Sequence, residues 1–301
     1  MSDSKFDTNV TVPLRHVRCP VCDTAQIAEG DDYLATLRCG ACQCSFRYLD
    51  GYLWYFHQRP ESFVTSDYVL PLVPGFTVGG ELLVEPNEIY QIQFTSLFGK
   101  PPEVLFLTGS GGGIPDLLRD NLYISAFSVK PQEFLILTRI FDRTRPAKSQ
   151  LVRWMAIGEL KIDREKPLWL IYLDNAVELI RKDELRAAVV ILLIALDFFY
   201  DEQLSEMGIT YEEVRARGRR PGMNEKKAKL QLLQEQLGEF PLSLQERLRD
   251  VTDYRNRIVH PIVRRSEVLE VPPNDAFVTI LSTVQTVLSR RYRKGAIHEK
   301  V

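Results

Sequence analysis

The chain has 301 residues, of which 45% are hydrophobic and 26% are charged, and its formal net charge is −2. This length exceeds that of one compact core of ordinary size, so we expect two or three domains. The small net charge excludes a global basic field that attracts nucleic acid, and any contact with RNA or DNA must come from local clusters.

Two stretches bear on localisation. The first twenty residues are polar and contain no apolar segment of the kind that a secretion signal needs. The longest apolar run covers residues 187–196 and would span only about 15 Å as a helix, which is too short for a bilayer. We therefore expect a cytoplasmic protein without a membrane segment.

The five cysteines lie close together in the sequence. Cys19 and Cys22 form one CxxC pair, and Cys39 and Cys42 form a second pair after sixteen intervening residues. This spacing is typical of a four-thiolate zinc site, and a chain without a secretion signal argues against disulfides. Cys44 offers an alternative fourth ligand, but we favour Cys42 because it completes the second pair.

The two CxxC pairs and the short segment between them resemble a zinc ribbon. The resemblance implies that residues 1–57 form a small domain around a structural zinc ion. Four thiolate ligands leave no open coordination position, so we do not expect this metal to be catalytic.

Residues 76–160 are rich in short alternating apolar runs, such as "IYQIQF" and "FLILTRIF", separated by turns that contain Gly and Pro. This pattern predicts antiparallel strands. Within it, "KPPEVLFL", "DNLYISAFSVKPQEF" and "LVRWMAIG" resemble the H-type lectin domain. The resemblance implies a small antiparallel β-sandwich that tends to form trimers. Trp154, at a strand position, is expected in the core rather than as a platform for a sugar.

The sugar-binding residues of that family are not conserved in this sequence. An arginine of the family's galactose-type site corresponds to Tyr123, and a histidine corresponds to Asp142. We therefore expect the sandwich architecture, used for assembly or for binding a partner, rather than lectin activity.

From residue 166 to the end of the chain, helical periodicity predicts an all-α bundle. One predicted helix contains "RLRDVTDYRNRIVHP". On an ideal helix Arg255 falls in the apolar stripe, about 40° from Val251. The stripe comprises Leu244, Leu248, Val251, Ile258 and Ile262. A guanidinium in such a position needs a carboxylate, a phosphate or a wet cleft.

"RNRIVH" and the order of the surrounding helices resemble the HEPN superfamily (higher eukaryote and prokaryote nucleotide-binding domains). The resemblance implies a metal-independent ribonuclease of the toxin or antiviral-defence type, with a composite site formed by two copies of the chain. His260 would act as general acid or base, Arg255 would hold the scissile phosphate, and Asn256 would orient the histidine or the phosphate by hydrogen bonds. A dimerising helical domain and a trimerising sandwich together would form a hexamer.

Basic segments on either side of the motif offer candidate RNA contacts. They comprise Arg217, Arg219, Arg220, Arg264 and Arg265. Asp197, in the long apolar helix, is a candidate partner for Arg255 when no substrate is bound, and a core or capping role is the equal alternative.

The predicted fold class is a multidomain α+β protein with a zinc ribbon (1–57), a β-sandwich (76–160) and a helical domain (166–301). RNA and a second copy of the chain are the expected partners, and zinc is the expected metal. The alternative function is a non-catalytic binding or assembly protein that recognises a glycan, a nucleic acid or another protein.

Overall fold

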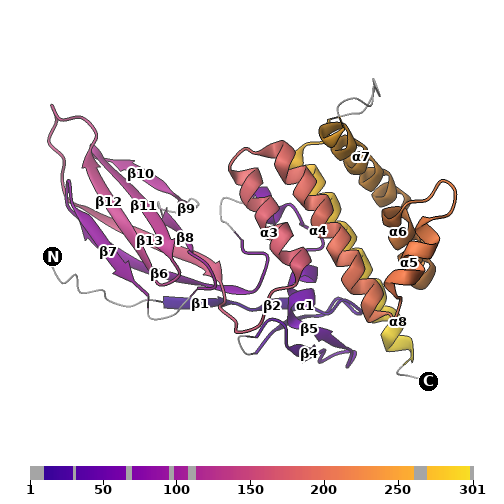
Figure 1. Ribbon diagram of the computed structural model, residues 1–301. Coiled ribbons are helices and arrows are strands. Elements are labelled where there is room, and N and C mark those ends of the chain that lie inside the picture. The colour runs from indigo at the N-terminus through magenta and orange to yellow at the C-terminus, as the bar shows by residue number, and fades with distance from the viewer. Residues whose placement is uncertain are drawn as a thin grey trace. The chain divides into compact units, whose positions relative to one another are not determined.

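The computed structural model describes residues 10–29, 32–65, 70–94, 98–107, 113–260 and 270–298. It is an α+β fold with antiparallel sheets and a helical C-terminal region, as the sequence predicts (Figure 1). Contacts within the chain define two compact units, which we call the sandwich unit and the helical unit. The sandwich unit comprises the described parts of Met1–His16, Ile27–Tyr33 and Ser66–Asp163, and the helical unit those of Val17–Gln26, Leu34–Thr65 and Arg164–Val301.

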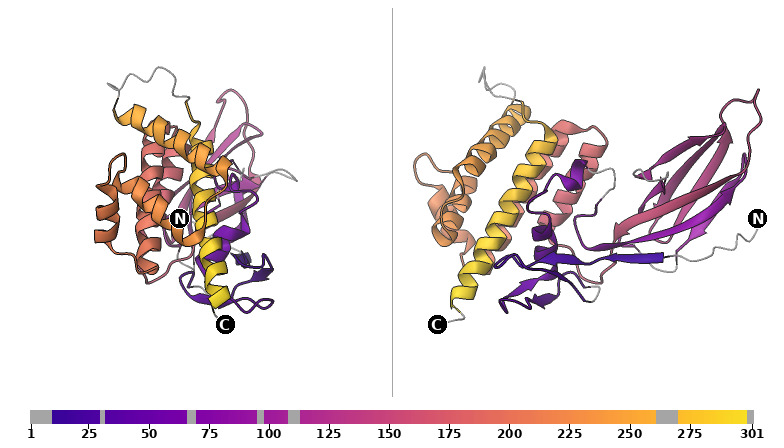
Figure 2. Two further views of the ribbon diagram at one scale, coloured as in Figure 1. Left: turned by 90° about the vertical axis from the view of Figure 1, so that its right-hand side faces the viewer. Right: turned by 180° about the vertical axis from the view of Figure 1, so that it is seen from behind.

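The sandwich unit consists of two antiparallel sheets. In the first sheet the strand order is β1 (Val10–Leu14), β6 (Gly75–Val84), β13 (Gln150–Glu159), β8 (Glu103–Leu107) and β9 (Gly113–Ile114). In the second sheet it is β10 (Asp116–Arg119), β11 (Leu122–Lys130), β12 (Glu133–Ile140) and β7 (Ile89–Gln93). Figure 2 shows the strands of this unit from two further directions.

The strands alternate between a buried and an exposed face because successive side chains of a strand point to opposite sides. In β12, Phe134 and Ile136 are fully buried, whereas Arg139 is exposed. The inner faces of both sheets contribute to one core, in which Phe134 packs edge-on against Trp154. Trp154 is thus a core residue, as expected.

The cysteines lie on two short hairpins in the helical unit. The first hairpin joins β2 (His16–Arg18) to β3 (Ala25–Ile27), and the second joins β4 (Thr36–Arg38) to β5 (Ser45–Arg47). Helix α1 (Tyr48–Tyr55) follows β5 directly, and α2 (Ser62–Thr65) follows α1. Gly51 allows α1 to approach the second hairpin, since a Cβ atom at this position would lie 2.4 Å from the Phe46 ring.

Six further helices complete the described part of the helical unit. They are α3 (Leu168–Arg181), α4 (Leu185–Glu206), α5 (Tyr211–Gly218), α6 (Glu225–Leu237), α7 (Leu242–Val259) and α8 (Pro273–His298). The apolar run 187–196 lies in α4, which contacts α3, α6, α7 and α8 (Figure 1). Within the described ranges, the structure contains no helix with the length and apolarity needed to span a membrane.

Candidate functional site

Four cysteines form a compact cluster at the tips of the two hairpins. The Sγ atoms of Cys19 and Cys42 are 3.6 Å apart, and those of Cys22 and Cys39 are 3.5 Å apart. All four sulfur atoms lie within 4.8 Å of one another. Four thiolates at tetrahedral corners around zinc would be separated by roughly 3.8 Å, from a Zn–S distance of about 2.3 Å. The cluster is therefore compatible with a zinc site.

The two hairpins hold their cysteines with the same backbone geometry. In the first, the amide of Asp23 donates to the carbonyl of Cys19; in the second, the amide of Gln43 donates to the carbonyl of Cys39. Asp23 and Gln43 both adopt a left-handed conformation, with φ of 62° and 63°. The repeated turn brings the two CxxC pairs to equivalent positions, which explains why a sequence spacing predicts the cluster.

Cys42 belongs to the cluster, and Cys44 does not. The Cys44 thiol is buried and lies 3.5 Å from the carbonyl oxygen of Ser45. The environment of the cluster also favours a thiolate at one position. Although burial acts in the opposite direction, hydrogen bonding to Thr24 and to the neighbouring cysteines lowers the pKa of Cys22 to about 6. Metal binding requires such deprotonated sulfur.

The cysteine hairpins pack directly on α8. The hydroxyl of Ser289 donates to the carbonyl of Pro20, inside the first CxxC pair, over 2.7 Å. Tyr292 and Ala296 pack against the cysteine cluster. The side chain of Gln285 donates to the carbonyl of Leu53 in α1. A metal held by the cysteines would thus stabilise contacts of the longest described helix.

A group of charged and polar residues around a buried carboxylate, the Asp50 cluster, strengthens the same junction. It comprises Arg47, Asp50, Glu202, Gln203, Glu206, Arg291 and Tyr292. The carboxylate of Asp50 is fully buried and accepts hydrogen bonds from Arg47 (3.0 Å), Arg291 (3.3 Å) and Tyr292 (2.5 Å). Both guanidinium groups also bind glutamates of α4. This cluster was not predicted from the sequence, although an aspartate inside the otherwise apolar and aromatic stretch "YLDGYLWYF" was a signal for it.

The predicted apolar stripe of α7 is correct only over the first part of the helix. Leu244, Leu248 and Val251 are buried, but the next fully packed position is Tyr254, and Ile258 is only half-buried. Arg255 is half-buried as well. Burial declines after Tyr254, so the arginine on the stripe does not enter a sealed core. The cost of desolvating its charge is correspondingly small.

The three motif residues lie at this outer end of α7. A guanidinium N–H of Arg255 donates to the side-chain oxygen of Asn256 over 3.2 Å, and Asn256 is exposed. His260 ends the helix with a non-helical backbone (φ −124°, ψ 71°) and an exposed side chain. This position agrees with the effect of Pro261, which disfavours a helical conformation in the preceding residue. The side chains of Arg255 and His260 therefore both reach solvent.

Arg255 belongs to a second group of charges, the Arg255 cluster, formed by three helices. It comprises Asp197 and Asp201 of α4, Lys226 and Lys229 of α6, and Arg255 of α7. Asp197 is not the ion-pair partner that we expected for Arg255, because its carboxylate binds Lys229 at 3.0 Å. Burial, together with the charges of Arg255 and Lys229, lowers the pKa of Lys226 to about 8, against the opposing effect of Asp197.

The predicted RNA contacts differ in their environments. Arg219 and Arg220 are exposed after α5, whereas Arg217 is half-buried and forms an ion pair with Glu235 of α6. Arg264 and Arg265 lie outside the described residues. Lys229, a further cation on α6, is buried and forms ion pairs with Asp197 and Asp201. Only a tertiary contact distinguishes such a paired cation from a cation that remains available to bind RNA.

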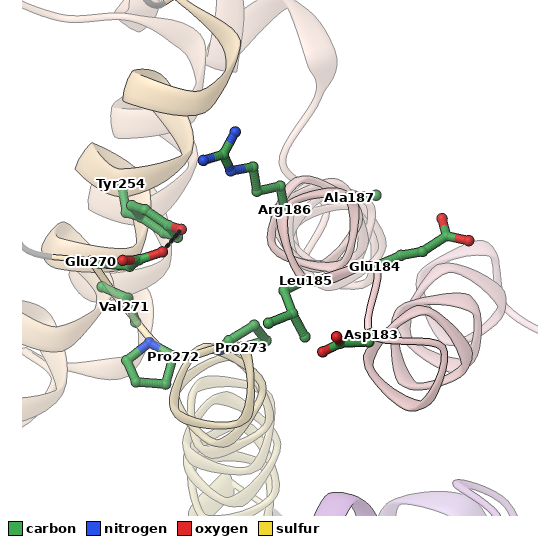
Figure 3. A pocket seen from close by; sticks show the side chains of 10 residues that line it. All are labelled: Asp183, Glu184, Leu185, Arg186, Ala187, Tyr254, Glu270, Val271, Pro272 and Pro273. Carbon is green, nitrogen blue, oxygen red and sulfur yellow. Dashed lines mark hydrogen bonds between the residues drawn. The ribbon is translucent and has the colours of Figure 1, made fainter.

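A pocket of about 740 Å³ lies on another side of the motif helix (Figure 3). Its wall contains Tyr254, whose hydroxyl donates to the carboxylate of Glu270 over 3.0 Å, and Arg186 of α4. None of the three predicted catalytic residues is among its lining residues. The pocket is therefore distinct from the candidate site at the end of α7.

The outer face of the sandwich unit carries a second hollow, of about 620 Å³. Phe127 and Ile89 line it and are largely exposed. Tyr123 lies in the same wall, with the guanidinium of Arg139 4.6 Å from its ring centre. Asp142 accepts hydrogen bonds from the backbone amide and the hydroxyl of Thr144 in a turn.

No protein-family model matches the sequence, and neither a curated protein nor a solved structure is significantly similar to it.

Proposed function

We propose that the chain is a metal-independent endoribonuclease of the toxin or antiviral-defence type, with a HEPN-like helical domain as its catalytic part. The observation that carries this proposal is the outer end of α7, where Arg255, Asn256 and His260 all reach solvent and Arg255 donates a hydrogen bond to Asn256. Cleavage of RNA without a metal needs a cation that binds the phosphate and a group that transfers protons. A guanidinium and an imidazole can supply these two functions.

The reaction uses the ribose 2′-hydroxyl as the nucleophile. Its oxygen attacks the adjacent phosphorus, the bond from phosphorus to the 5′-oxygen breaks, and a 2′,3′-cyclic phosphate and a 5′-hydroxyl are formed. A base removes the 2′ proton and an acid protonates the 5′-oxygen; His260 serves one of these roles. Arg255 stabilises the charge that develops on the phosphate, while Asn256 orients the guanidinium.

A second copy of the chain completes the site. On an ideal helix Arg255 and His260 point about 140° apart, so one copy does not bring both groups to the same phosphate without local unwinding. Pairing of two α7 ends would supply the missing group across a two-fold axis. The cysteine cluster then holds a structural zinc ion, and the lectin-like sandwich acts as a sensing or oligomerising module.

The test is cleavage of RNA by the zinc-containing full chain and by the His260→Ala variant, in EDTA, with the zinc content measured after the reaction. His16→Ala is the matched control, because His16 is also exposed and lies far away in the sequence. We expect the control to cleave RNA and the His260 variant to lose roughly 10²- to 10⁴-fold in rate. Equal cleavage by both variants, or no cleavage under any activating condition, would contradict the proposal.

A second candidate function is binding without catalysis, through the sandwich unit. It is favoured by the hollow lined by Phe127, Ile89 and Tyr123, since large exposed apolar side chains are typical of interaction surfaces. Ligand or partner binding that survives Arg255→Ala, in a protein without nuclease activity, would favour this candidate.

A further inference from the structure

The pocket of about 740 Å³ in the helical unit is formed by the turn into α4, by α7 and by the segment that leads into α8 (Figure 3). Its volume falls within the range of about 300–1,000 Å³ that is typical of small-molecule sites. Leu185, Val271 and Pro273 give one part of its wall an apolar surface, and Leu185 is 40% exposed. This wall can cover one face of a flat ligand.

Glu270 supplies a hydrogen-bond acceptor at a fixed position in the pocket. Its Oε1 atom accepts from the hydroxyl of Tyr254 over 3.0 Å, and Tyr254 is only 7% exposed. Burial and the carboxylate of Glu270 raise the pKa of Tyr254, so the hydroxyl keeps its proton and holds the carboxylate. Among the described residues, none donates to Oε2 of Glu270. Because an ionised carboxylate only accepts, this side of the pocket favours a ligand with N–H groups.

Arg186 supplies donors from a different side of the same opening (Figure 3). It is exposed, and within the part of the chain that the structure describes it forms neither a hydrogen bond nor an ion pair. Arg186 and Glu270 therefore line one pocket without pairing with each other. A ligand between them can use the guanidinium and the carboxylate together.

We propose that this pocket binds a guanine base of the RNA substrate, with Glu270 and Arg186 as the residues that determine base specificity. Guanine is planar, and its Watson–Crick edge carries two adjacent donors, N1–H and the N2 amino group, which match the two oxygens of Glu270. Its O6 and N7 atoms are adjacent acceptors, which match the N–H groups of a guanidinium.

The other RNA bases fit these two side chains less well. Adenine and cytosine have a ring nitrogen that accepts beside their amino group, and uracil has a carbonyl on each side of its N3–H group. Each of these bases would therefore bring an acceptor against the carboxylate of Glu270, and a pair of acceptors without a proton between them is unfavourable.

The pocket lies next to the proposed catalytic end of α7 but not within it. Tyr254 directly precedes Arg255, and consecutive side chains leave a helix about 100° apart. A base in the pocket is thus held beside the reacting phosphate, and Tyr254 acts through Glu270 as a positioning residue. The inference rests on the proposed function only for the RNA, whereas binding of guanine is independent of cleavage.

The first experiment compares the affinities of three nucleosides for the zinc-containing full chain by saturation-transfer NMR. Guanosine, inosine and adenosine carry no phosphate, so the basic segments contribute little to their binding. We expect guanosine to bind roughly tenfold or more tightly than adenosine. Inosine, which lacks the N2 amino group, should lie between them. Equal affinities for guanosine and adenosine, or no binding of guanosine, would overturn the proposal.

The second experiment reverses the preference. Glu270→Gln replaces two acceptors by one acceptor and one donor, which match adenine instead of guanine. We expect the affinity for guanosine to fall roughly tenfold or more and that for adenosine to rise, an increase that a damaged fold would not produce. Glu184→Gln is the matched control, because Glu184 lines the pocket but its carboxylate points away from the opening (Figure 3). It should leave both affinities within roughly twofold. Equal losses in the two variants would contradict the site.

Two 2′-O-methylated oligoribonucleotides that differ only in one purine show whether the guanine comes from RNA. We expect the oligonucleotide with guanine to bind more tightly, and Glu270→Gln to remove the difference. If guanosine binds but the oligonucleotides do not differ, the pocket takes a free guanine compound and the assignment to RNA is wrong.

The outcomes separate this inference from the nuclease proposal. If no preference for guanine is found, the base site is wrong even when His260→Ala abolishes cleavage. If Glu270→Gln reverses the preference but the His260 variant cleaves RNA normally, the guanine site stands and the assignment of His260 falls.

Discussion

Helix α4 contributes to two groups of charged side chains that differ in how their charges are balanced. In the Asp50 cluster, each guanidinium binds both Asp50 and a glutamate, and the central carboxylate is fully buried. In the Arg255 cluster, both carboxylates bind Lys229 and are about half exposed, while Lys226 and Arg255 have no carboxylate at ion-pair distance among the described residues.

This difference distinguishes a structural network from a candidate binding site. A buried carboxylate such as that of Asp50 needs partners of opposite charge, because an isolated buried charge costs several kcal/mol. An excess of one charge sign at a half-exposed position costs less and is relieved by a ligand of opposite charge. The comparison predicts large stability effects for changes near the Asp50 cluster and mainly binding effects for changes in the Arg255 cluster.

The largest effect is expected from loss of the metal from the cysteine cluster. The cysteine hairpins and the Asp50 cluster contact the same helix, α8. Cys39→Ser should abolish stoichiometric zinc binding and lower the melting temperature of the helical signal by roughly 10 °C or more, because structural zinc contributes about 10–16 kcal/mol of apparent binding energy in small peptides. Zinc analysis and circular dichroism check this result. Cys44→Ser is the control, and it should keep the zinc.

The next largest effect, on the free energy of unfolding, is expected from Asp50, the central carboxylate of the Asp50 cluster. Asp50→Asn keeps the shape of the side chain but removes the charge that faces Arg47 and Arg291, so we expect the free energy of unfolding to fall by about 3–5 kcal/mol. Asp201→Asn, in the half-exposed cluster, should cost about 1 kcal/mol or less. Urea unfolding measures both. Similar losses in the two variants would remove the distinction between the clusters.

A smaller effect is expected from pH. The pKa of Lys226 is about 8 in the folded chain and should return to about 10.4 on unfolding. Between these values the unfolded chain binds more protons, so stability should rise with pH. Unfolding at pH 7.5–10.5 should show that Lys226→Met removes this rise and Lys227→Met keeps it. Asp197, Lys229 and Arg255 are the charges that act on Lys226 throughout.

The smallest effect separates Arg217, which forms an ion pair, from the two exposed arginines of the same basic segment. Arg219→Gln combined with Arg220→Gln should reduce the salt dependence of RNA binding by roughly 1.4 in the slope, about 0.7 for each lost phosphate contact. Arg217→Gln should leave the slope unchanged because Arg217 is paired with Glu235. Fluorescence anisotropy at several salt concentrations tests this; equal effects would show that the ion pair opens for RNA.

Local patterns predicted much of the molecule correctly. The CxxC spacing identified the four clustered cysteines, because each pair forms the same tight turn whatever its surroundings. Alternating strands and helical periodicity identified the antiparallel sheets and the C-terminal helices, since each period reflects one buried face. The effect of Pro261 on its neighbour located the end of α7 at His260.

Other features depend on contacts between distant segments. Periodicity placed Arg255 and Ile258 within a buried stripe, but the burial of side chains along α7 declines after Tyr254. The expected pairing of Asp197 with Arg255 failed because Lys229 reaches that carboxylate from α6. No spacing in the sequence shows which of several nearby cations will occupy one carboxylate.

The sequence by itself thus determined the element types, the four metal-binding candidates and the motif residues Arg255, Asn256 and His260, because these depend on neighbours within a few residues. Only the tertiary structure decided that the cysteine hairpins belong to the same compact unit as the C-terminal helices, through Asp50 and α8. It also decided which charges are paired. The physical reason is that the burial and balance of a charge depend on segments that meet only after the chain has folded.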